Sequence, residues 1–144
     1  MILVDTSAWI EFLRGSGHAA HVTLKYHLTQ RSPVVTTEVV IMELLAGTRS
    51  RREHSRLRVR LLAFPQLTLR GLPDFEHAAE LYRSCRRKGE TVRKLTDCLI
   101  AAVAIREGAT VLHNDKDFEV LARCTRLCTE HSHPDTASGS SGGT

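Results

Sequence analysis

Aromatic residues and long apolar segments are both scarce in this sequence of 144 residues. Phe, Trp and Tyr together make up 5% of the chain, too few to build the stacking platform with which single-strand binding proteins hold bases. No apolar run approaches the roughly 20 residues of a membrane-spanning helix. The first apolar run is interrupted at Asp5, which is too early for a secretory signal. We therefore expect no membrane association and a cytoplasmic location.

Cysteine is scarce as well. The chain has four cysteines and no CxxC pair, so we expect reduced thiols rather than a disulfide scaffold. Four potential metal ligands lie close together in the sequence near the C-terminus, namely Cys124, Cys128, His131 and His133. Their spacing fits no common zinc finger. The sequence leaves open whether this cluster binds anything. The two thiols are expected simply to pack, either one helical turn apart or beside a short strand.

The net charge of +4 is unevenly distributed along the chain. Residues 49–60 and residues 83–94 each contain six basic residues against one acidic residue, so the remainder of the chain is acidic. This separation is typical of a protein that holds a polyanion on one surface and gathers carboxylates elsewhere. Two solvated helix faces are the alternative interpretation. From the first stretch we select Arg51, Arg52 and Arg56 as candidate contacts to nucleic-acid phosphates.

Short apolar runs alternate with longer segments of helical character. Strands are expected at 2–4, 34–35, 66–69 and 110–112, and helices at 8–13, 19–30, 38–46, 51–62, 75–88, 96–107 and 118–122. Strands separated by helices predict an α/β fold, with a short central parallel sheet flanked by helices. Apolar residues become rare after His131. We expect one domain over residues 1–131 and a flexible Ser/Gly-rich tail over residues 132–144.

Acidic residues follow the expected strands and interrupt the expected helices. Asp5 directly follows the first strand, and Asp115 and Asp117 follow the last, so they can meet at the carboxyl edge of the sheet, where sites form in such folds. Each of these acids, and Asp97 at the start of its helix, can be explained singly as a helix cap or turn residue. Glu43 is different, because a carboxylate within a nearly all-apolar helix needs a partner.

Convergence of these acids has a chemical consequence. Four or five negative charges in one pocket repel one another, and only protons or hard divalent cations relieve the repulsion. Oxygen ligands suit Mg²⁺ or Mn²⁺ rather than zinc. One or two such ions can activate water and neutralise charge on a scissile phosphate, so the pocket requires no serine or cysteine nucleophile.

Four segments of the chain resemble the acidic motifs of PIN-domain ribonucleases. They are ILVDTSAW (2–9), VIMELLAG (40–47), TDCLIAA (96–102) and NDKDF (114–118). Their order, spacing and total length are most similar to the VapC toxins of bacterial toxin–antitoxin pairs, over residues 1 to about 130. The resemblance implies a three-layer Rossmann-like sandwich and Mg²⁺- or Mn²⁺-dependent endonucleolytic cleavage of RNA, usually tRNA or ribosomal RNA. It also implies a homodimer that a cognate VapB-like antitoxin inhibits.

The resemblance also carries site residues onto this chain by position. The catalytic, metal-binding carboxylates fall on Asp5, Glu43, Asp97 and Asp115, with Asp117 as a further metal ligand. Thr6 and Ser7 match polar positions beside the first acid, where a hydroxyl can orient a carboxylate. His113 stands where the family commonly has threonine, and we expect it to be a hydrogen-bonded structural group rather than a proton carrier.

Other functions fit the same fold. A catalytically silent PIN-fold module that binds RNA or protein would retain the architecture. A phosphatase of the haloacid dehalogenase type would have a second aspartate two positions after Asp5, where this chain has Ser7. A receiver domain would carry its phosphorylated aspartate after a middle strand, and no aspartate of this chain fits that place.

Overall fold

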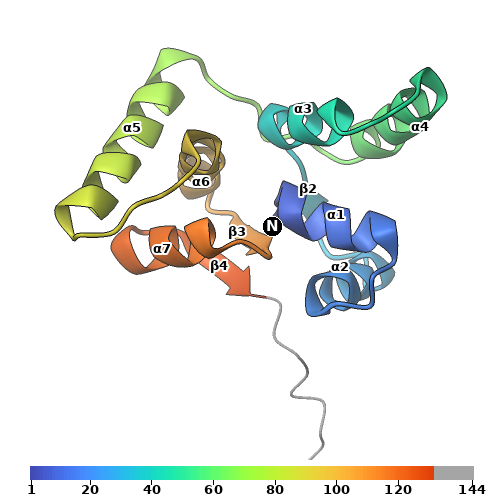
Figure 1. The fold of residues 1–144 in the computed structure, drawn as a ribbon, viewed down its shortest axis with the longest axis horizontal. Coiled ribbons are helices and arrows are strands. Elements are labelled where there is room, and N and C mark those ends of the chain that lie inside the picture. The colour runs from blue at the N-terminus through green and yellow to red at the C-terminus, as the bar shows by residue number, and fades with distance from the viewer. Residues whose placement is uncertain (132–144) are drawn as a thin grey trace, which may run out of the picture.

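The computed structural model describes residues 1–131 and shows an α/β fold built on one parallel sheet (Figure 1). The strands are β1 (Ile2–Val4), β2 (Val34–Val35), β3 (Thr110–His113) and β4 (Cys128–His131). Their order in the sheet is β2-β1-β3-β4, and all neighbours run parallel. In register, Ile2 lies between Val34 and Thr110. The carboxyl ends of β1 and β3 are therefore adjacent.

Helices cover both sides of this sheet. The helices of the described residues are α1 (Thr6–Arg14), α2 (Ala19–Thr29), α3 (Glu38–Ala46), α4 (Arg51–Leu62), α5 (Leu72–Arg87), α6 (Leu95–Glu107) and α7 (Lys116–Cys124). Helices α1 and α2 pack together on one side, and α5 packs against α6 on the other (Figure 1). The α/β sandwich expected from the sequence is confirmed. No helix among residues 1–131 is both long and apolar enough to cross a membrane.

Helix α6 is the centre of the core. Its residues from Cys98 to Ala104 are all buried, and it contacts α3, α5, α7 and β3. Alanine at 101, 102 and 104 has no long side chain, so neighbouring elements can approach the helix closely on several sides. Leu3, Val4, Val111 and Leu112 of the two central strands are fully buried beside it. The N-terminus of α6 is thereby fixed against the carboxyl edge of the sheet.

One expected strand is absent, and one observed strand was not expected. The strand expected at 66–69 is wrong, since Gln66 forms only an isolated bridge with Thr36. The next ladder position is lost because the Leu69 amide donates to the side chain of Glu38, at 2.8 Å, instead of to a strand. The fourth strand is instead β4, whose residues Cys-Thr-Glu-His lack the apolar character by which strands are recognised. The tail expected at 132–144 lies outside the described residues.

A shielded ion pair fastens α5 to α6. The Arg106 guanidinium donates from Nε and Nη2 to the two oxygens of Asp74, at 3.0 and 2.9 Å, and from Nη2 to the Thr68 carbonyl at 2.7 Å. The Arg70 amide donates to the same carboxylate, which is only 3% exposed. Hydrogen bonds from Arg106 hold the pKa of Asp74 below its ordinary value. This one guanidinium thus joins two helices and the segment between α4 and α5.

We expect Arg106→Met to lower the free energy of unfolding by about 2–3 kcal/mol, because it leaves the Asp74 carboxylate buried without its cation. Urea denaturation monitored by circular dichroism measures the change. Arg83→Met is the matched control, since Arg83 pairs with Glu80 on the exposed face of α5, where little stability is at stake. Equal losses in the two variants would contradict a special role for Arg106.

Candidate metal centre and active site

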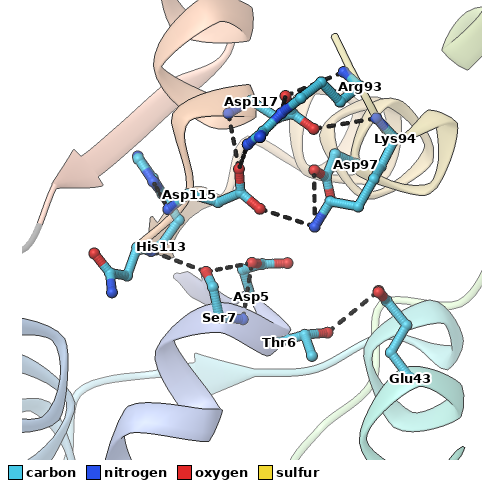
Figure 2. Close-up of polar contacts among 11 residues, drawn as sticks. Asp5, Thr6, Ser7, Glu43, Arg93, Lys94, Asp97, His113, Asp115 and Asp117 are labelled. Atoms are coloured by element: carbon cyan, nitrogen blue, oxygen red, sulfur yellow. Dashed lines mark hydrogen bonds and ion pairs between the residues drawn. The ribbon is translucent and has the colours of Figure 1, made fainter.

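Asp5 and Asp115 face each other across the carboxyl edge of the sheet (Figure 2). Asp5 follows β1 and caps α1 by accepting the Ser7 amide, while Asp115 follows β3 and caps α7 by accepting the Asp117 amide. The Ser7 hydroxyl donates to Asp5 Oδ2 and accepts the Asn114 amide at 2.9 Å. A single hydroxyl therefore ties the ends of the two central strands together. Burial raises the pKa of Asp5, although its hydrogen bonds with Ser7 oppose the shift.

Glu43 reaches the same edge from α3. Thr6 Oγ1 donates to Glu43 Oε1 at 3.2 Å (Figure 2), so the first residue of α1 orients a carboxylate 37 positions away. The side chain is half-buried. Burial, followed by the negative charge of Asp5, raises the pKa of Glu43. From the sequence, a partner is expected for this carboxylate. The structure places the Thr6 hydroxyl and the acidic cluster beside it.

Asp97 completes the cluster from the first turn of α6. One oxygen each from Asp97, Asp115 and Asp117 lies within 4.8 Å of the others. Asp97 is only 1% exposed, and burial together with the charge of Asp5 raises its pKa to about 8. The charge of Asp5 acts on Asp97, and the charges of Asp5 and Asp115 act on Glu43. The five acids therefore form one electrostatic cluster, drawn from four segments far apart in the chain.

Two cations that the sequence did not single out cover this cluster. Lys94 Nζ lies 2.8 Å from Asp115 Oδ2 and 3.5 Å from Asp97 Oδ2. The Arg93 guanidinium lies 3.6 Å from Asp115 and 3.4 Å from Asp117. Burial alone would raise the pKa of Asp115, but its hydrogen bond with Lys94 brings it below the ordinary value. Arg93 and Lys94 stand four and three positions before Asp97, at the end of a basic stretch. This spacing was the sequence feature that could have indicated their place beside the cluster.

Asp117 organises the segment that carries these cations. Its Oδ1 accepts the Arg93 amide and its Oδ2 accepts the Lys94 amide, each at 3.1 Å. The carboxylate is 2% exposed, and both of its oxygens already accept hydrogen bonds from protein. Asp117 therefore fixes the start of α6 as well as adding charge to the cluster.

The donor set fits a hard divalent cation. Oδ1 of Asp5 and Oδ2 of Asp97 are buried and accept no hydrogen bond within the described residues, although Lys94 lies 3.5 Å from the latter. Buried carboxylate oxygens without donors are costly unless a proton or a cation satisfies them. All candidate ligand atoms are oxygens, which suits Mg²⁺ or Mn²⁺. The residues present can therefore hold such an ion.

Helices α1, α6 and α7 all begin at this cluster. Asp5 precedes α1, Asp97 lies in the first turn of α6, and Asp115 precedes α7. The unsatisfied amide groups at a helix N-terminus carry a partial positive charge. Three such ends therefore face the carboxylates and offset part of their repulsion.

The histidines and cysteines singled out from the sequence, as far as the structure describes them, do not belong to the acidic cluster. His113 is fully buried; its Nδ1 accepts the Asp115 amide and its ring packs on Phe118, as expected of a structural histidine. Cys124 is buried, as expected, whereas Cys128 is exposed on β4, so the expectation that both thiols pack is wrong for Cys128. Within residues 1–131, the acidic trio is the only group of three potential ligands found close together, and it contains no cysteine. His133 lies outside the described residues.

The chain resembles known proteins over most of its length. The PIN-domain family matches residues 2–123. Ribonuclease VapC11 of Mycobacterium tuberculosis is 44% identical over 128 residues, which cover 88% of this chain and 96% of that protein. The structure of VapBC2 from Rickettsia felis, bound to a promoter DNA fragment, matches with a TM-score of 0.70 at 22% identity over 91% of this chain and 98% of that chain. The structure of DNA-bound VapBC from Salmonella typhimurium matches with a TM-score of 0.72 at 20% identity, over 92% of this chain and 98% of that chain.

A short parallel sheet with acids gathered at its carboxyl edge is the architecture of a PIN domain, and the match over residues 2–123 shows that the chain belongs to that family. Within the family it belongs with the VapC ribonucleases, since nearly the whole length of VapC11 aligns with it at 44% identity. The resemblance read from the four motifs is confirmed.

The raised pKa of Asp97 predicts how stability depends on pH in metal-free buffer. The unfolded chain loses this proton near its ordinary pKa of 3.8, whereas the folded protein keeps it until about pH 8. The folded state thus binds more protons in this interval, so the free energy of unfolding falls as pH rises from about 4 to about 8.

The amide side chain of Asp97→Asn cannot ionise, so the free energy of unfolding of this variant should fall less steeply as pH rises. At pH 8 the variant should be more stable than the wild type by at least about 1 kcal/mol. Urea denaturation in EDTA, at several values between pH 5 and pH 8, measures both profiles. Glu76→Gln, which removes an exposed carboxylate from α5, should follow the wild type. Parallel profiles for Asp97→Asn and the wild type would show that Asp97 is already ionised in the folded protein.

Proposed function

We propose that this chain is a metal-dependent endoribonuclease toxin that cleaves RNA phosphodiester bonds and is neutralised by a VapB-like antitoxin. The observation that carries the proposal is the convergence of five carboxylates, from four separate segments, at one edge of the sheet (Figure 2). Relatives named VapC ribonucleases supply the substrate class. The usual targets of the family, tRNA or ribosomal RNA, are the substrates we expect.

Asp5, Glu43, Asp97 and Asp115 would hold Mg²⁺ or Mn²⁺, with Asp117 beside them. A bound divalent cation lowers the pKa of water and neutralises charge that develops on a phosphate. The chain's own groups set the geometry: Ser7 fixes the Asp5 carboxylate and Thr6 fixes that of Glu43. Because hydroxyl groups hold the Asp5 and Glu43 carboxylates, these two ligands are oriented before substrate arrives.

The partner follows from the family. Neighbouring structures are VapBC complexes, in some cases on DNA, and a VapB-like antitoxin would silence this site by covering the carboxylates with a cation of its own. A homodimer and a cytoplasmic location, where RNA is at hand, complete the proposal. The phosphatase alternative is disfavoured, because Ser7 already bridges Asp5 and Asn114 where that chemistry requires a second aspartate.

Asp5→Asn and Asp97→Asn should each reduce the rate of RNA cleavage by at least about 100-fold, since each removes charge that holds the cation. The rate is measured on a mixture of tRNA and ribosomal RNA with Mn²⁺. Cleavage by the wild type should stop in EDTA and return when Mn²⁺ is restored. Glu76→Gln, which keeps the cluster intact, should cut at the wild-type rate. A wild type that binds these RNAs and cuts none would instead identify a silent binding module.

The basic face of α4 is the proposed path for RNA. Arg51, Arg52 and Arg56 are exposed on this helix. Arg52 and Arg56 line a hollow with Leu57, and an adjoining hollow that also contains Leu57 reaches Glu43. A strand of RNA along this surface would have its phosphates within reach of arginine and a scissile bond near the carboxylates.

Changing Arg51, Arg52 and Arg56 together to Gln should weaken RNA binding and reduce the slope of log affinity against log salt by about 2, since each lost phosphate contact contributes about 0.7. Fluorescence anisotropy of a labelled RNA with Asp97→Asn, at several salt concentrations, provides the slopes. The matched control changes three exposed arginines of α5, namely Arg83, Arg86 and Arg87. An equal reduction in the control would assign the effect to net charge alone.

A further inference from the structure

Lys94 occupies an unusual place for a surface lysine. Its ammonium lies within hydrogen-bond distance of Asp115 and 3.5 Å from Asp97, and it is attracted by the charge of Asp5 as well. Figure 2 shows the side chain reaching into the cluster, with contacts to both carboxylates. The Asp97–Asp115 side of the cluster therefore already holds a cation that belongs to the protein.

The same oxygens are the ones proposed to bind the divalent cation. Mg²⁺ binds carboxylate oxygens at about 2.1 Å, whereas the ammonium lies 2.8 Å from Asp115 Oδ2. A monovalent and a divalent cation so close together also repel each other strongly. The ammonium and the metal ion therefore exclude each other from the Asp97–Asp115 pair.

The ammonium can leave without disturbing the fold. The backbone of Lys94 is fixed independently, because Asp117 accepts its amide at 3.1 Å. The side chain is 48% exposed, and its four-carbon stem is flexible. Departure of the ammonium into solvent would leave the start of α6 in place.

We propose that Lys94 is an internal counter-ion that competes with the divalent cation for Asp97 and Asp115. In the metal-free protein its ammonium occupies the position beside the two carboxyl groups, and it is displaced when the cation binds. The proposal rests on the proposed function, because it takes these carboxylates to be the metal site. In this role Lys94 is a positioning residue that sets the affinity for metal.

The test is a titration of Mn²⁺ into the metal-free, full-length protein, followed by isothermal titration calorimetry and by the paramagnetic resonance signal of free Mn²⁺. Removing the competitor in Lys94→Met should lower the Mn²⁺ dissociation constant about fivefold, corresponding to the loss of one competing ion pair. Lys94→Gln serves as a second neutral variant should the first fail to fold. Lys94→Arg, which retains a cation, should bind Mn²⁺ within about threefold of the wild type.

Lys88→Met is the control for net charge. Lys88 belongs to the same basic stretch, but its ammonium bonds the Cys124 carbonyl rather than a carboxylate, so the Mn²⁺ affinity should not change. A purely structural role for Lys94 would weaken metal binding on substitution, whereas competition predicts tighter binding.

The outcomes separate this inference from the proposed function. Unchanged or weaker Mn²⁺ binding by the folded neutral variants, in a protein whose wild type binds Mn²⁺ and cuts RNA, would overturn the role of Lys94 alone. A gain of affinity in Lys88→Met equal to that in Lys94→Met would overturn it too. A wild type that neither binds Mn²⁺ nor cuts RNA would overturn both proposals.

Discussion

Mutual repulsion among carboxylates at one edge of the sheet is the constraint to which the rest of the structure responds. Asp5 and Asp97 are almost fully buried, and the charge of Asp5 acts on both Asp97 and Glu43. Such a cluster is stable only where protons, cations, helix ends or hydrogen-bond donors share the negative charge. The hydroxyls of Thr6 and Ser7 and the two cations before α6 supply that balance from within the chain.

Much of this arrangement could be predicted from the sequence, for reasons that particular residues make clear. Asp5 and Asp115 directly follow short apolar strands, and parallel pairing alone brings such positions together. Glu43 stands out because its neighbours in the chain are apolar. Strand β4 was not predicted because its residues are polar and show no apolar pattern. The segment at 66–69 does have a strand-like pattern, but the Leu69 amide donates to the Glu38 side chain instead of to a neighbouring strand. Neither fact is visible without tertiary contacts.

The two basic stretches also show what cannot be predicted from the sequence without tertiary contacts. Both have equal charge in the sequence, yet their surroundings differ. In the second, Lys88 bonds a carbonyl of α7, while Arg93 and Lys94 lie on the acidic cluster, so part of this stretch neutralises the protein itself. In the first, Arg51, Arg52 and Arg56 remain exposed. Composition cannot distinguish cations that serve the interior from cations that are available to a partner, because the difference lies in which acids the fold places beside them.

The three helices that begin at the cluster have a consequence for how the site behaves between bound states. Side-chain cations can move away and carboxylates can gain or lose protons, but the dipole of a helix is a property of its backbone. The positive ends of α1, α6 and α7 therefore form a permanent background potential that is insensitive to acidity and cannot diffuse away. With that background built into the scaffold, the pocket can exchange its mobile positive charges without the surrounding architecture having to rearrange each time.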